Sequence, residues 1–108
     1  MDSVEVLVLR GEFDAYTMPL LGDRFDRAIG TGHYDFVLDM SEVTFVDMST
    51  LNRIVRAMKE IYRHNGHLVV VSGQRSVLRA IDLAGLRHAV RVYPSRDEAF
   101  AHLRDRAA

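Results

Sequence analysis

Short apolar runs that alternate with amphipathic segments are the feature that most constrains the fold of this chain. Four such runs occur, at residues 4–9, 35–40, 67–72 and 90–93. The first and third are apolar on both strand faces, which is typical of a parallel sheet covered by helices. Because a helical segment follows each run, the chain is predicted to form one α/β domain over residues 4–104. The prediction is a mostly parallel sheet of about four strands alternating with four helices, joined by right-handed connections.

Apolar residues at helical spacing predict the four helices. The second helix is the clearest, because its apolar residues fall on one face: Leu51, Ile54, Val55, Met58, Ile61 and Tyr62. Three helices follow residues that favour helix starts, namely Thr17, Ser76 and Ser95. Three end near residues that accept a left-handed backbone, namely Gly32, Asn65 and Gly85. Residues 11–14 are predicted to form a loop, and Ser41–Glu42 are predicted to turn the chain after the second strand.

Length, charge and composition exclude several classes of protein. A chain of 108 residues fits one domain with one core, and a net charge of −1 provides no field for binding nucleic acid or a membrane surface. No apolar run approaches the roughly 20 residues that span a bilayer, and Met1–Ser3 does not resemble the start of a signal peptide. Cysteine is absent, which excludes disulfides and thiol chemistry and fits a reducing compartment. We therefore expect a cytoplasmic protein.

No arrangement of polar residues in the sequence predicts an enzyme. The five histidines fall on different predicted elements without the spacing of metal ligands: His33, His64, His67, His88 and His102. The sequence has no nucleotide-binding glycine motif and no G-x-S-x-G motif, and the glycines at 30 and 32 follow a helix instead of a strand. We therefore expect neither a metal site nor a catalytic set of side chains.

Polar chemistry concentrates at the junction formed by residues 43–51. An apolar run ends at Asp47 and the clearest helix begins within the next few residues. Asp47, Ser49 and Thr50 therefore lie where free backbone N–H groups meet the positive end of a helix dipole. Such a position favours negative charge, from a bound anion or from a phosphoryl group on a hydroxyl. Plain helix capping explains the same residues, and the residues alone leave both interpretations open.

Three segments resemble the motifs of STAS domains, the fold of sulfate transporters and anti-sigma factor antagonists. Leu9–Asp14 is similar to the family's L-x-G-E-L-D motif, and Phe36–Ser49 is similar to its segment that contains D-S-S-G. Leu68–Leu86 resembles a third stretch that ends in Gly-Leu. The resemblance covers residues 4–103 and implies the STAS fold. The family usually has a further strand before this point, where the chain has only Met1–Ser3, so that strand is expected to be missing or very short.

The resemblance implies a protein-binding switch. In the family's anti-sigma factor antagonists, the second serine of D-S-S-G accepts a phosphoryl group, and alignment through Asp47 places Ser49 at this position. The unphosphorylated chain would bind an anti-sigma factor with serine kinase activity, phosphorylation of Ser49 would end binding, and a phosphatase would restore it. ATP belongs to the kinase, so no cofactor is expected, and the chain is expected to be a monomer or weak homodimer. The expected partner contacts are Asp14, Asp47, Met48, Thr50, Asn52 and Arg53.

Departures from the family motif leave a second hypothesis open. Met48 replaces the first serine, Thr50 replaces the glycine, and Asn52 replaces a second glycine. These replacements favour a STAS module that serves as a scaffold, or as a subunit of a transport or signalling complex, without phosphorylation. A third hypothesis is a small-molecule binder or enzyme that uses carboxylates near the strand ends, where open α/β sheets bind ligands: Asp14, Asp39 and Asp47.

Overall fold

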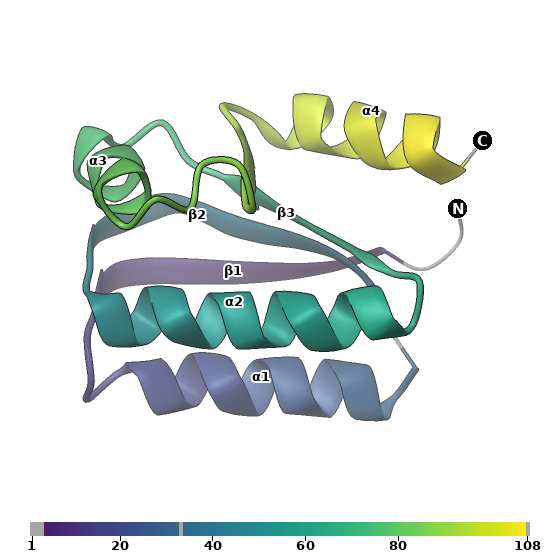
Figure 1. Ribbon diagram of the computed structural model, residues 1–108, viewed down its shortest axis with the longest axis horizontal. Coiled ribbons are helices and arrows are strands. Elements are labelled where there is room, and N and C mark those ends of the chain that lie inside the picture. The colour runs from purple at the N-terminus through teal and green to yellow at the C-terminus, as the bar shows by residue number, and fades with distance from the viewer. Residues whose placement is uncertain (1–3, 33, 108) are drawn as a thin grey trace.

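The computed structural model describes residues 4–32 and 34–107, which form strands and helices in strict alternation (Figure 1). The elements are β1 (Val4–Phe13), α1 (Met18–Gly30), β2 (Asp35–Val46), α2 (Met48–Arg63), β3 (His67–Val71), α3 (Arg75–Leu83), β4 (Arg91–Tyr93) and α4 (Arg96–Ala107). The predicted alternation of four strands with four helices is confirmed. The expectation about a strand before Val4 concerns Met1–Ser3, which lie outside the described residues, as does His33.

The strands form one parallel sheet in the order β1-β2-β3-β4. The run predicted as the third strand therefore occupies an inner position, whereas the equally apolar β1 forms an edge of the sheet. Helices α1 and α2 lie side by side under one face of the sheet, and α4 covers the opposite face (Figure 1). Helix α3 packs against β2 near the carboxyl ends of the strands, and its buried residues belong to the same cluster.

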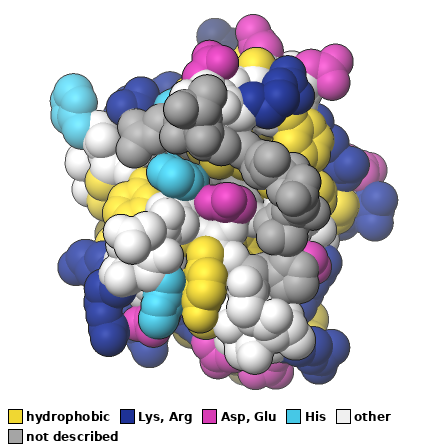
Figure 2. All heavy atoms as spheres, turned by 90° about the vertical axis from the view of Figure 1, so that its right-hand side faces the viewer, with side chains coloured by type: hydrophobic (Ala, Val, Ile, Leu, Met, Phe, Trp, Pro, Cys, Tyr) yellow, Lys and Arg dark blue, Asp and Glu magenta, His cyan; other side chains and the backbone are white. Residues whose placement is uncertain are grey.

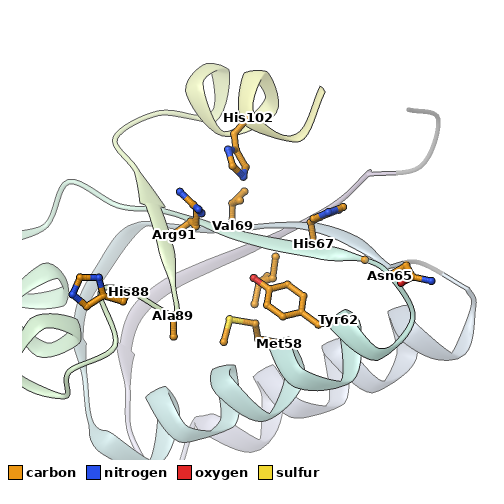
Figure 3. Close-up of a pocket in the computed structure, with 11 residues that line it drawn as sticks. Met58, Tyr62, Asn65, His67, Val69, His88, Ala89, Arg91 and His102 are labelled. Atoms are coloured by element: carbon orange, nitrogen blue, oxygen red, sulfur yellow. The ribbon is translucent and has the colours of Figure 1, made fainter. Parts of the chain in front are cut away.

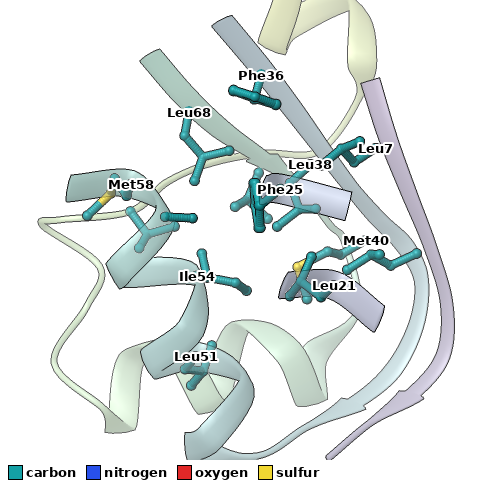
Figure 4. Close-up of a cluster of buried hydrophobic side chains, with 14 of the residues drawn as sticks. Leu7, Leu21, Phe25, Phe36, Leu38, Met40, Leu51, Ile54, Met58 and Leu68 are labelled. Carbon is teal, nitrogen blue, oxygen red and sulfur yellow. The ribbon is translucent and has the colours of Figure 1, made fainter. Parts of the chain in front are cut away.

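The larger core fills the space between the sheet and helices α1 and α2 (Figure 4). At its centre the rings of Phe25 and Phe36 meet edge to face, with centroids 5.8 Å apart. Burial of each such side chain contributes about 1.5–3 kcal/mol to stability. The smaller core lies under α4 and uses the alternate residues of the same strands: Val37, Val69 and Val71. The apolar face predicted for α2 is buried at Leu51, Ile54, Met58 and Ile61, whereas Tyr62 near its end is 45% exposed.

Strands β1 and β2 are longer than predicted. The loop expected from Gly11 and the turn expected at Ser41–Glu42 are wrong, because the two segments pair with each other up to Phe13 and Val46. The ladder shifts register after Val8 and again after Gly11, whose φ of 85° suits a glycine. Long-range pairing, which the local sequence does not encode, therefore overrides the turn-forming residues.

The helix ends match the predictions in part. Asn65 and Gly85 have the predicted left-handed backbone, with φ of 62° and 71°. Ser95 caps α4 as predicted, because its hydroxyl accepts from the N–H of Glu98 at 3.2 Å. Ser76 is not a cap: α3 begins one residue earlier, and the Ser76 hydroxyl instead donates to the carbonyl of Thr44 at 2.7 Å. Thr17 occupies the N-cap position of α1 without a side-chain cap bond.

Candidate functional site

The junction between β2 and α2 is organised around the carboxylate of Asp47. Asp47 is the N-cap of α2, and its Oδ1 accepts from the N–H of Thr50 at 3.0 Å. The same oxygen accepts from the hydroxyls of Ser49 at 2.7 Å and Thr50 at 3.1 Å. The backbone N–H of Asp47 donates to the carbonyl of Phe13, which fixes the junction to the end of β1. Capping by Asp47 is therefore confirmed, and it holds the Ser49 hydroxyl in a defined orientation.

These hydrogen bonds keep Asp47 ionised. The largest influence is the hydrogen bond from the Ser49 hydroxyl, followed by the N–H of Thr50, and together they hold the pKa of Asp47 below its ordinary value despite partial burial. The N–H of Ala15 acts in the same direction, so the β1–α1 loop also contributes. A fixed negative charge thus lies beside the Ser49 hydroxyl.

Ser49 and Thr50 differ in accessibility. Ser49 is partly exposed, whereas Thr50 is completely buried, with 0% of its surface accessible. The β-branched side chain that replaces the family's glycine therefore points inward and does not cover Ser49. Of these two residues, only Ser49 has surface exposed to solvent.

Asp14 lies next to this junction and shapes the β1–α1 loop. Its carboxylate accepts from the N–H of Tyr16 at 2.9 Å and of Thr17 at 3.2 Å, and its carbonyl accepts from the N–H of Met18. The loop held in this way carries Ala15, whose N–H points at Asp47. Asp14 and Asp47 are thus brought together, although the hydrogen bonds that Asp14 accepts come from its own loop and the start of α1.

Exposed apolar side chains occupy the same end of the sheet. Met48 is 53% exposed at the first residue of α2, and Asn52 is also exposed one turn later. Phe45, near the end of β2, is 45% exposed. We call the following four residues the apolar rim: Tyr16, Leu20, Phe45 and Met48. Sequence reasoning missed Tyr16 and Leu20, because a single apolar residue in a loop or first helical turn gives no periodic signal.

Arg53 is held within the fold. Its Nη2 donates to the carbonyl of Gly22 at 3.3 Å and to Asp26 Oδ1 at 3.0 Å, and only 13% of its side chain is exposed. A Cβ on Gly22 would lie 2.9 Å from the Arg53 Nε, so the glycine makes room for the guanidinium. Arg53 therefore joins α2 to α1, while Asn52 beside it faces outward.

Asp39 lies apart from the other two carboxylates of the third hypothesis. It projects toward α4, where its Oδ2 accepts from Arg96 Nε at 2.6 Å and its Oδ1 accepts from the hydroxyl of Ser41 at 2.6 Å. Burial, the largest single influence, raises the pKa of Asp39, but hydrogen bonds from Ser41 and Arg96 together lower it below its ordinary value. Asp14, Asp39 and Asp47 therefore do not converge. Within residues 4–32 and 34–107, no group of three His, Asp or Glu side chains could hold a metal ion.

The lowered pKa of Asp47 predicts a specific pH dependence. A carboxylate with a folded-state pKa below its unfolded value, about 3.9, stabilises the protein above that pH, and the contribution is lost as pH falls through the folded pKa. Asp47→Asn keeps a capping oxygen, so we expect a loss of at most about 1 kcal/mol at pH 7. The difference in free energy of unfolding between Asp47→Asn and the native chain should shrink toward pH 3, as measured by urea unfolding. Asp23→Asn, on the exposed face of α1, should show the same dependence of the free energy of unfolding on pH as the native chain. If Asp47→Asn also shows this dependence, the lowered pKa of Asp47 is refuted.

Comparisons with known proteins agree with this fold. A model of the STAS domain matches residues 1–99. A Thermotoga maritima protein assigned to the anti-sigma factor antagonists is 30% identical over 80 residues, which cover 74% of this chain and 71% of that protein. The anti-sigma F factor antagonist of Paenibacillus polymyxa is 28% identical over 101 residues, covering 93% of this chain and 86% of its own. The crystal structure of an anti-sigma factor antagonist from Mycobacterium paratuberculosis is 27% identical with a TM-score of 0.87, covering 96% of this chain and 88% of that chain.

The chain belongs to the STAS domain family. Within this family it groups with the anti-sigma factor antagonists, at 27–30% identity to the three proteins above. None of the helices formed by the described residues combines the length and apolarity needed to cross a membrane.

Proposed function

We propose that this chain is an anti-sigma factor antagonist that binds an anti-sigma factor through the start of α2 and is released by phosphorylation of Ser49. The observation that carries the proposal is the partly exposed Ser49, which lies at a helix N-terminus beside the apolar rim. An exposed apolar rim with a polar centre is typical of a protein-binding surface. Binding would sequester the anti-sigma factor and free its sigma factor, in the cytoplasm, with the chain acting as a monomer or weak homodimer.

The partner in this proposal is an anti-sigma factor with serine kinase activity. The kinase supplies ATP and transfers its γ-phosphoryl group to the Ser49 oxygen, so the chain itself needs no cofactor and catalyses no step. Met48, Asn52 and the loop shaped by Asp14 form the surface that the partner covers. Asp47 and Thr50 act from beneath this surface by holding the first turn of α2, and Arg53 acts by holding α2 against α1.

Phosphorylation would end binding through local electrostatics. A phosphoserine adds about −1.5 to −2 charges at neutral pH. At Ser49 this charge would replace a hydroxyl that now lies 2.7 Å from the Asp47 carboxylate oxygen. The helix N-terminus can hold a phosphate without a change of fold, but a partner surface that desolvates both charges would lose affinity. A phosphatase would restore the binding surface.

Phosphotransfer is tested with an anti-sigma factor kinase from the same organism. We expect one phosphate per chain after incubation with kinase and ATP, and fragmentation mass spectrometry should place it on Ser49. Ser49→Ala should accept none, and no phosphate is expected on Thr50 because that side chain is buried. Phosphate that persists in Ser49→Ala, or native protein that stays unmodified while binding the kinase, would contradict the assignment of Ser49.

A second candidate function is a STAS scaffold that is not switched by phosphorylation. It is favoured by the exposed Met48, which places an apolar side chain where the switch motif has a serine. A scaffold in a transport or signalling complex would use the same apolar rim for constant association. The two functions differ in how binding responds to a negative charge at position 49.

A further inference from the structure

A hollow of about 620 Å³ lies at the end of α2 opposite to Ser49 (Figure 3). It is lined by residues from α2, the start of β3, the segment that leads into β4, and α4; those used below are Met58, Leu68, Val69, Ala89, Arg91 and His102. A helix rises about 1.5 Å per residue, so roughly 20 Å separate Ser49 from this end of α2. The hollow is therefore separate from the proposed antagonist surface.

The hollow exists because β4 is short. β4 pairs with β3 only from Val69 onward, so the first residues of β3 have no neighbour in β4. The N–H of His67 donates toward β2, to Tyr34, and the N–H of Ser72 donates toward β4, to Tyr93. Because the N–H groups of a strand alternate in direction, the N–H of Leu68 points to the β4 side, below the point where β4 begins. A backbone donor is thus directed at the hollow.

Arg91 provides a cation beside this donor. It is exposed at the first residue of β4, and no hydrogen bond or ion pair holds its guanidinium within the part of the chain that the structure describes. Figure 3 shows the guanidinium of Arg91 and the imidazole of His102 drawn toward the same region above Val69. His67 contributes less, because the carboxylate of Asp35 lies 3.1 Å from its Nδ1 and offsets any positive charge there.

The remaining walls of the hollow are apolar. Met58 and Ala89 line it below Arg91 (Figure 3). Figure 2 shows the end of the molecule at the right of Figure 1, where basic side chains of the described residues lie toward the edges and alternate with acidic ones. This distribution provides no continuous basic surface for a polyanion and favours a small ligand.

We propose that this hollow binds a small molecule with an oxyanion on an apolar body, with Arg91 as the anchor. The guanidinium would pair with a carboxylate or phosphate, the N–H of Leu68 would donate to the same oxyanion, and the apolar body would lie against Met58 and Ala89. Guanidinium–oxyanion pairs are strong because they are charge-assisted and bidentate. The volume lies within the range of about 300–1,000 Å³ that is typical of ligand sites.

The test is a titration of the full ¹⁵N-labelled chain, followed by NMR, with three probes of similar size: phenyl phosphate, benzoate and the neutral benzamide. We expect saturable shifts of the Leu68, Val69 and Arg91 amides with at least one anion. The stronger of the two anions identifies the oxyanion as phosphate or carboxylate. Benzamide should bind at least about tenfold more weakly, because it lacks the charge. Equal shifts with benzamide, or no saturable shift with either anion, would overturn the proposal.

Two variants test the site independently of each other. Arg91→Gln should weaken binding of the anion at least about tenfold, whereas Arg79→Gln, an exposed arginine of α3 outside the hollow, should not. Ala89→Leu should block the hollow while leaving Arg91 in place. Amide spectra confirm that each variant is folded. Unchanged affinity in both Arg91→Gln and Ala89→Leu would show that the anion binds elsewhere.

Discussion

Ser49→Asp is expected to weaken binding to the anti-sigma factor by at least about a hundredfold, which corresponds to about 2.7 kcal/mol. The new carboxylate would lie beside that of Asp47, which already accepts three hydrogen bonds and is held ionised by them. A partner that covers the junction would have to desolvate two adjacent like charges. The variant itself should remain folded, because an acidic residue in the first turn of a helix interacts favourably with the helix dipole.

Matched variants separate the effect of the added charge from the loss of the hydroxyl and from the position of the charge. Ser49→Ala removes the hydroxyl without adding charge, so it should bind with near-native affinity and stay bound in the presence of ATP. Asn65→Asp adds the same charge at the far end of α2, at a left-handed position that aspartate tolerates, and should bind as the native chain does. Isothermal titration calorimetry measures all four affinities. If Ser49→Asp binds like the native chain, the scaffold function is correct and the switch is not.

The sequence predicts the elements of this fold better than their extents. Each helix carries its own periodic apolar face and each strand its own apolar run, so their existence depends on neighbouring residues alone. The extension of β1 and β2 to Phe13 and Val46 depends on pairing between segments about 30 residues apart. No local pattern predicts this pairing, and residues such as Gly11 and Ser41 predict turns instead.

The same distinction applies to the site. Asp47 and Ser49 follow from the strand-to-helix transition, which is a local feature, and both occupy the predicted positions. The environments of Thr50 and Arg53 follow from packing against other elements: Thr50 is buried beneath the turn, and Arg53 is held by α1. A sequence can therefore indicate where a helix begins and which groups lie there, but it does not show which of them face a partner.

Gly66→Ala is expected to destabilise the fold by about 3 kcal/mol, because a Cβ at this position has no room. It would overlap the carbonyl oxygen of Tyr34 and approach the side chains of Tyr34 and Ile61. Neither the Tyr34 carbonyl nor the backbone of Gly66 can move away. The Tyr34 carbonyl accepts from the N–H of His67 at 2.9 Å, and the N–H of Gly66 donates to Ile61 at 3.0 Å in the bond pattern that ends α2.

Gly73→Ala is the matched control for this prediction. Nothing lies within 4 Å of a Cβ built on Gly73, and its backbone is not left-handed, so alanine should change stability by no more than about 0.5 kcal/mol. Thermal unfolding followed by circular dichroism should show Gly66→Ala melting about 10–20 °C below the native chain and Gly73→Ala melting close to it. Equal melting temperatures for the two variants would mean that the turn after α2 can move away from Tyr34.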